Sequence, residues 1–135
     1  MVDISITPAN VVKGTDAVVQ SGIAGATILA GQSVARDVDG LIKLYDSDSA
    51  SSNIRTLLGV ALHGASANQP IQFQTGGNIT IGGTVVTGTV YLGSDTAGGI
   101  RPAVDLNSGD FTSVLGIAIS AAAIKIGIVN GGVAF

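Results

Sequence analysis

The 135-residue chain has no cysteine, no tryptophan and no glutamate, and it has only one histidine. Without cysteine it can form neither disulfides nor thiolate metal sites. Six lysine and arginine residues stand against nine aspartates, which gives a formal net charge of −3, and the sequence contains no basic cluster. Sequence-independent binding to phosphates needs the opposite charge balance, so we expect no nucleic-acid partner.

The sequence also lacks the segments that direct proteins to membranes or anchor them there. Its first eight residues contain neither the basic region nor the long apolar region of a signal peptide, so we expect synthesis in the cytoplasm without a signal peptide. The most apolar stretch, 116–135, is interrupted by serine, lysine, asparagine and several glycines. These interruptions favour strands over a membrane span, and we expect no membrane partner.

The residues that are abundant predict an all-β protein. Every acidic residue is aspartate, whereas glutamate, the carboxylate that favours helices, is absent. Valine, isoleucine and threonine form short apolar runs, and the 20 glycines and most of the charges lie in polar clusters between these runs. This composition is typical of strands joined by tight turns.

An internal repeat predicts how the strands are organised. Leu58-Gly59-Val60-Ala61-Leu62 recurs 57 residues later as Leu115-Gly116-Ile117-Ala118-Ile119, and the same offset relates residues 27–34 to 84–91. We therefore predict an arm and first strand over residues 1–25, followed by a single β domain over 26–135 made of two pseudo-repeats, 26–80 and 83–135. The expected fold is a small β-barrel or sandwich of two similar halves with an extended N-terminal arm.

Two features of this pattern carry specific expectations. Gly59 and Gly116 lie inside otherwise strong strand sequence, which indicates a bulge or the close approach of another backbone. In the arm, Ile4-Ser5-Ile6-Thr7 alternates like a strand before Pro8. Such a segment can pair within its own subunit or add to a sheet edge of a neighbour, and we predict Ile4, Ile6 and Pro8 as contacts with a partner protein or another subunit.

Catalytic chemistry finds little support in the residue types present. His63, the only histidine, would be the base of a hydrolytic triad, but no Gly-x-Ser-x-Gly motif accompanies it, and a solvent-facing histidine at a strand end is the preferred interpretation. We predict no catalytic residues and no enzyme activity.

Metal and cofactor sites are predicted to be absent as well. Asp37-Val38-Asp39-Gly40 and Asp46-Ser47-Asp48 resemble parts of a calcium loop, yet no glutamate closes it and Asp-Gly is a common hairpin turn. The Gly-Gly pairs lack the helix and lysine of a phosphate loop. We expect the charged side chains of Arg36, Arg55, Arg101, Asp37 and Asp39 to lie on the surface and assign them no role.

Several short motifs carry a resemblance to a known family. These are Ala-Gly-Gln-Ser-Val (30–34), Asp-Gly-Leu-Ile-Lys-Leu (39–44), Leu-Leu-Gly-Val-Ala-Leu (57–62), Tyr-Leu-Gly-Ser (91–94) and Leu-Gly-Ile-Ala-Ile (115–119). Over residues 24–135 the chain resembles the small capsid decoration, or cement, proteins of tailed bacteriophages. The second half departs from the pattern because Ala97-Gly98-Gly99 replaces the Asp-Gly turn, and the arm carries no matching motif.

The resemblance implies a structural virion protein on the outer capsid surface, where it clamps neighbouring capsomers. Its partners would be the major capsid protein and further copies of itself, as a homotrimer rather than a dimer. An alternative function is that of a head-fibre or tail adhesion module that binds host glycans through the polar loops 47–53 and 105–110. An enzyme that uses His63 is the third and weakest hypothesis.

Overall fold

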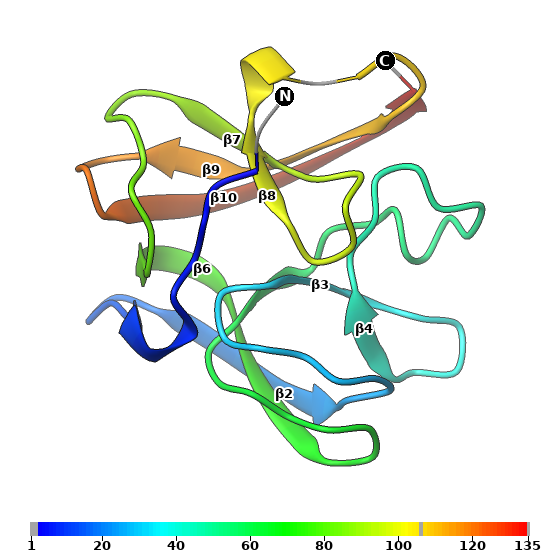
Figure 1. The fold of residues 1–135 in the computed structure, drawn as a ribbon. Helices are drawn as coiled ribbons and strands as arrows, with labels where there is room; N and C mark the ends of the chain where they lie inside the picture. The colour runs from blue at the N-terminus through cyan, green and yellow to red at the C-terminus, as the bar shows by residue number, and fades with distance from the viewer. Residues whose placement is uncertain (1–2, 106, 135) are drawn as a thin grey trace.

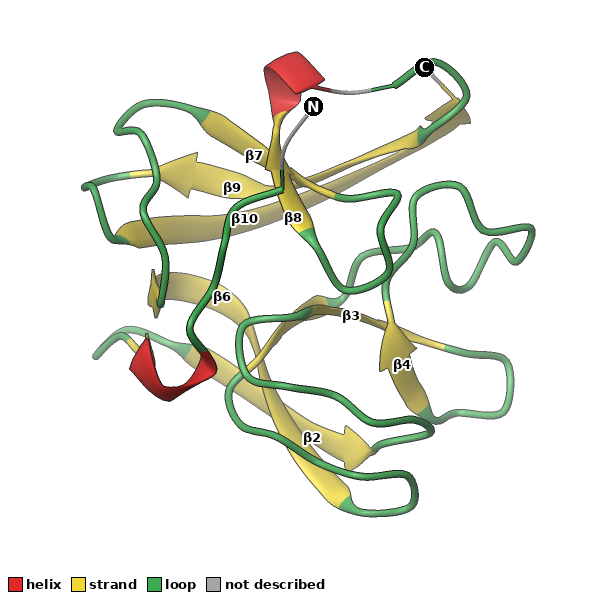
Figure 2. Cartoon of the chain, in the orientation of Figure 1, coloured by secondary structure: helices red, strands yellow, loops and turns green. Residues whose placement is uncertain are grey.

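The computed structural model describes residues 3–105 and 107–134, and within these residues the chain is all-β, as predicted (Figures 1 and 2). Met1 and Val2 of the predicted arm, Leu106 of a predicted loop and Phe135 lie outside the described residues. Two 3-10 helices, η1 (Pro8–Asn10) and η2 (Ala103–Asp105), have three residues each. The strands are β1 (Val11–Lys13), β2 (Val18–Ile23), β3 (Ser33–Arg36), β4 (Ile42–Leu44), β5 (Gly59–Ala61), β6 (Pro70–Ile81), β7 (Val90–Gly93), β8 (Ile100–Pro102), β9 (Phe111–Ala118) and β10 (Ala123–Ala134).

The strands form a curled antiparallel sheet with a symmetric order. The main path runs β4-β3-β5-β6-β10-β9-β7-β8, and β1 and β2 pair with β6 off this path. In the first half β3 pairs with β4 and β5, and in the second half β7 pairs in the same way with β8 and β9. The pairing of β6 with β10 joins the two halves.

Backbone hydrogen bonds outside the strands recur at the same spacing of 57 residues. The Gly31 amide donates to the Ala61 carbonyl at 2.8 Å, and the Gly88 amide donates to the Ala118 carbonyl at 2.8 Å. The Ala61 amide bonds the Gln32 carbonyl at 2.9 Å, and the Ala118 amide bonds the Thr89 carbonyl at 3.0 Å. The two halves thus share the geometry by which the chain enters β3 and β7.

The long strand β6 belongs to two parts of the sheet. Its first part pairs with β2 and β5, which together with β3 and β4 we call sheet B. Its last part, 77–81, pairs with β1 and β10, which together with β7, β8 and β9 form sheet A. The change occurs at Gly77, whose φ of 80° is readily adopted only by glycine. A β-carbon there would also overlap the Asp16 carbonyl.

Two apolar clusters fill the interior, and β3 and β5 lie between them. Val34 and Ala61 pack into a cluster formed by residues 24–73. Their chain neighbours Ala35 and Val60 point to the opposite face and pack into the larger cluster with side chains of sheet A. Because successive strand residues face opposite sides, both faces of β3 and β5 are buried. The strands β3 and β5 therefore form one continuous wall, shared by the two halves, between the two apolar clusters.

The close backbone approaches predicted at Gly59 and Gly116 are confirmed. A β-carbon at Gly59 would overlap the carbonyl oxygen of Gln74 on β6, and one at Gly116 would overlap the carbonyl oxygen of Lys125 on β10. Both glycines are buried in the strand that joins its half to the long central strand. A side chain at either position would force these strands apart.

The N-terminal arm extends along its own subunit between β8 and the end of β6 (Figure 1). The Ile4 amide donates to the Ile100 carbonyl, and the Thr7 amide donates to the Gly82 carbonyl, both at 2.8 Å. After η1, the chain continues into β1 and β2, which pair with β6. Neither three-residue helix of the described chain is long enough to span a bilayer.

Candidate functional site

The three contact residues predicted in the arm are brought together beside one hollow. Ile4 and Ile6 are half-buried and pack against the larger apolar cluster, while Pro8 is exposed at the start of η1. All three line a cavity of about 220 Å³ whose other walls come from residues 29–32 of the first half and 96–99 of the second. The arm therefore covers the junction between the halves and leaves Pro8 exposed to solvent.

His63 lies exposed after β5, and its ring bonds the backbone. The His63 Nδ1 lies 2.9 Å from the Gly64 carbonyl oxygen, and the Gln72 amide donates to Nε2 at 3.0 Å. These contacts fit the tautomer in which Nδ1 carries the proton. The histidine thus ties the β5–β6 connection, and among the hydrogen bonds of the described residues none joins it to a serine hydroxyl or a carboxylate.

The two aspartate pairs compared with a calcium loop lie in different environments. Asp37 and Asp39 flank the β3–β4 turn, where the Lys43 ammonium contacts their carboxylates at 2.8 and 3.3 Å. The hydrogen bond from Lys43 lowers the pKa of Asp37. Gly40 completes this turn with a φ of 83°. Asp46 and Asp48 belong instead to the loop after β4, next to residues of the second half.

Arg101, expected on the surface, is buried with 1% of its side chain exposed, which corrects that prediction. Its guanidinium bonds the carboxylates of Asp95 and Asp110, the latter at 3.2 Å, and Nε lies 3.5 Å from Asp3. Arg101 also donates to Ser94 Oγ at 2.8 Å, and this hydroxyl donates in turn to Asp3 at 2.7 Å. A buried guanidinium needs such partners because its desolvation is costly.

This Arg101 cluster joins the arm, β7, β8 and the start of β9. Ile100 points into the larger apolar core, so alternation along β8 turns Arg101 to the opposite face. The loop 107–110 then folds over the guanidinium, and the Asn107 amide bonds Asp110 while its side chain bonds Asp95 at 2.9 Å. No local sequence pattern predicts that Arg101 is buried, because the groups that cover it come from three separate segments.

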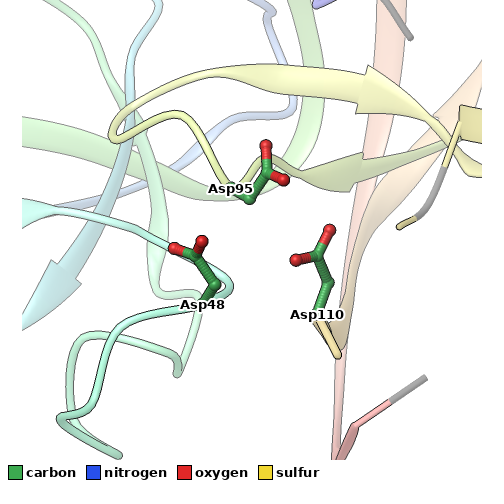
Figure 3. A group of neighbouring side chains, drawn as sticks. All are labelled: Asp48, Asp95 and Asp110. Carbon is green, nitrogen blue, oxygen red and sulfur yellow. The ribbon is translucent and has the colours of Figure 1, made fainter. Parts of the chain in front are cut away.

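Asp48 extends the cluster toward the first half of the chain. Asp48, Asp95 and Asp110 each place a carboxylate oxygen within 4.8 Å of the others, and their side chains converge from three loops (Figure 3). The pKa of neighbouring Asp46 is raised to about 6, mainly because burial desolvates its carboxylate and secondly because of its hydrogen bond with Asp48. These groups have the oxygen chemistry that hard cations prefer, but Asp95 and Asp110 already bind Arg101, so a metal would compete with the guanidinium.

A second candidate is the outer face of sheet A, which is apolar and solvent-exposed. A groove of about 560 Å³ runs over β7, β9 and β10. Ile117, Ile119 and Val129 beside it are 48, 46 and 62% exposed. Exposed apolar surface gathered in one place indicates a binding surface more strongly than scattered residues do. The sequence pattern alone did not single out this face, because its residues come from three strands.

No protein-family model and no curated protein matches this chain.

Proposed function

We propose that the chain is a structural virion protein that binds the outer surface of an assembled phage capsid and stabilises the contacts between capsomers. It would act without catalysis or a cofactor, as an oligomer of identical chains, with the major capsid protein as its principal partner. The observation that carries this proposal is an all-β fold with a weakly charged surface and an uncovered apolar sheet face. Such a surface is suited to being covered by protein partners.

The motifs that resemble decoration proteins lie at related places in the two halves. Residues 30–34 lead into β3 and 91–94 contain the end of β7, whereas 57–62 contain β5 and 115–119 contain the end of β9. They are thus the segments that build the shared wall and its counterpart in sheet A. This placement supports the internal repeat, because corresponding segments occupy corresponding strands in the two halves.

Cementing needs only binding, which fits the chemistry of the chain. A ligand that binds the intact lattice and not its separated parts stabilises the lattice by mass action. Repetition on a symmetric shell then turns many weak contacts into strong attachment. The net charge of −3 also disfavours adhesion to packaged nucleic acid, consistent with a place on the outer surface.

The test is to compare heads of the parent phage, stripped of decoration, with and without the purified protein. We expect saturable co-sedimentation at a fixed copy number per capsomer and a higher rupture temperature for the decorated heads. No binding would overturn the proposal. Binding with an unchanged rupture temperature would overturn the cementing role.

A variant of the arm tests where the capsid is met. Pro8 is exposed beside the cavity under the arm, so Pro8→Asp should lower the copy number on heads without unfolding the chain. Val38→Asp is the matched control, because Val38 is 86% exposed on the remote β3–β4 turn. Equal binding of both variants and the unaltered protein would remove the arm from the capsid contact.

One observation favours the alternative of an adhesion module for host glycans. The two loops predicted to bind sugars lie together, because the Phe111 amide bonds the Ser47 carbonyl at 2.9 Å and Asp48 approaches Asp110. Clustered carboxylates can accept hydrogen bonds from sugar hydroxyls. Against it, the chain has no tryptophan and only five other aromatic residues for stacking. A glycan array on which the purified protein gives no signal would remove this alternative.

A further inference from the structure

The apolar groove on sheet A has open space over one glycine, between flanking aliphatic side chains. Gly127 on β10 has no atom within 4 Å of the place a β-carbon would take, so the space above it is open. Around it stand the aliphatic side chains of Val90, Val114, Ile117, Ile119 and Val129. The groove can therefore accept apolar side chains from another molecule without rearrangement of its strands.

Among the described residues that line this groove, Lys125 is the only charged one. It lies between Asn78 of β6 and Ile117 of β9 in the strand register, with no aspartate among the lining residues. An occupant that covers the groove would desolvate the ammonium, which costs free energy unless the occupant brings a carboxylate. A face that met its own equivalent across a two-fold axis would bring two such ammonium groups and no carboxylate. The groove thus favours an acidic occupant.

The same chain has a strongly acidic region elsewhere. We call it the acidic end; it consists of Asp3, Asp46, Asp48, Asp95, Asp105 and Asp110 around Arg101, with Arg55 nearby against Phe111. Six aspartates and two arginines give it a formal charge of −4. The remaining three aspartates and four lysine and arginine residues give the rest of the molecule +1.

The acidic end also presents an exposed apolar side chain next to a carboxylate, which is the combination that the groove favours. Val104 on η2 is 87% exposed and is followed directly by Asp105. Within one chain the Asp110 carboxylate cannot reach Lys125, because Lys125 pairs with Ile117 and Asp110 lies seven residues before Ile117 along the chain. At strand spacing this separation is about 23 Å, far beyond the length of a lysine side chain.

We propose that copies of this chain associate head to tail, with the acidic end of one copy, led by Val104, seated on the Lys125 groove of the next. Such an interface uses two different surfaces of each subunit, so it closes into a ring when the rotation between neighbours permits. Charge complementarity steers the two surfaces together, and burial of the aliphatic side chains holds them. The proposal rests on the self-association included in the proposed function and not on capsid binding.

A charge exchange tests the interface. Light scattering after size exclusion, over a dilution series, should show an oligomer for the unaltered protein and a dissociation constant raised roughly tenfold or more for Lys125→Glu, because one attraction becomes a repulsion. Arg36→Glu is the matched control, since it makes the same charge change at the exposed last residue of β3 and should leave association unchanged. Adding Asp48→Lys and Asp105→Lys to the Lys125→Glu chain should restore the oligomer.

Three results would overturn the proposal: a monomer at the highest concentration; equal association of Lys125→Glu and Arg36→Glu, as expected if the groove met its own equivalent; or tighter association of Lys125→Glu, which would mean that the surface facing the groove is not acidic. Circular dichroism of each variant checks that it is folded. Head binding measured in parallel separates the two proposals. A monomer that still binds and stabilises heads refutes the interface alone, whereas an oligomer that does not bind heads refutes the capsid function alone.

Discussion

The side-chain amide of Asn130 pairs with both backbone groups of Leu57, 73 residues earlier in the chain. The Leu57 amide donates to Asn130 Oδ1 at 2.8 Å, and Asn130 Nδ2 donates to the Leu57 carbonyl at 3.1 Å. Asn130 lies on β10 beyond the last residue that pairs with β6, while Leu57 precedes β5. The Asn130 side-chain amide therefore takes the place of a backbone strand pair beyond the point where β10 and β6 stop pairing.

Replacement of Asn130 should loosen this junction. Asn130→Ala removes both partners of Leu57, and we expect a loss of about 1–3 kcal/mol in the free energy of unfolding. Asn130→Asp should cost at least as much, because its carboxylate keeps the acceptor but faces the Leu57 carbonyl. Urea unfolding measures both, with exposed Asn53→Ala as the control. Unchanged midpoints would show that the pair contributes nothing.

A second prediction concerns Gly93, which lies against the ring of Tyr45. A β-carbon at Gly93 would overlap this ring, which is fully buried in the larger apolar cluster. Gly93→Ala should therefore destabilise the fold by about 1–3 kcal/mol through overpacking. Thermal unfolding measures the loss, and Gly127→Ala, where the space is open, serves as the control.

The Gly93 effect can be assigned to the ring by a double-mutant cycle. The alanine at position 93 should cost less in a Tyr45→Ala background, since the clashing atoms are gone. Strict additivity of the two substitutions would contradict the clash as the cause.

Removal of the Arg101 guanidinium should be among the most damaging single changes. Arg101→Met leaves Asp110 buried without its cation, and uncompensated buried charge costs about 3–5 kcal/mol. Denaturant unfolding measures the loss, with Arg36→Met, at an exposed arginine, as the control. An unchanged midpoint for Arg101→Met would contradict this stabilising role.

The crowded carboxylates also predict how stability responds to pH. Burial and Asp48 raise the pKa of Asp46 to about 6 in the folded chain, above its ordinary 3.8. The folded state thus binds the proton more tightly than the unfolded state, so this contribution to stability is complete below pH 3.8 and is lost as the pH rises through about 6.

Asp46→Asn isolates this contribution. The amide can still accept the Asp48 backbone hydrogen bond but does not titrate, so stability between pH 4 and 7 should fall less steeply than in the unaltered protein. Unfolding midpoints across this range, with the carboxyl pKa followed by NMR, provide the measurement. Identical slopes for the two proteins would argue against Asp46 as the titrating group.

Much of the fold follows from local patterns. The short strand β5 lies within the repeated apolar run 58–62, because alternation and flanking turn residues act over a few neighbouring positions. Gly59 and Gly116 indicated close backbone contact before any partner strand was known. The repeat placed the two glycines at equivalent positions.

The candidate sites depend on contacts that no local pattern contains. Arg101 resembles any lone charge in a strand until Asp3, Asp95 and Asp110 surround it from three segments. The Lys125 groove exists only because β7, β9 and β10 lie side by side and carry small or aliphatic residues on the same face. In both, the sequence separation of the contributing residues hides the relationship.

The sequence by itself determined the all-β class, the short strands and their turns, since these depend on propensity, alternation and glycine at neighbouring positions. It also determined the charge balance and the shortage of catalytic side chains. Only the tertiary structure decided that an arginine is buried, that aspartates from distant loops share one end, and that an apolar face stays uncovered. These properties depend on long-range packing, which decides where each charge or apolar surface is shielded from water.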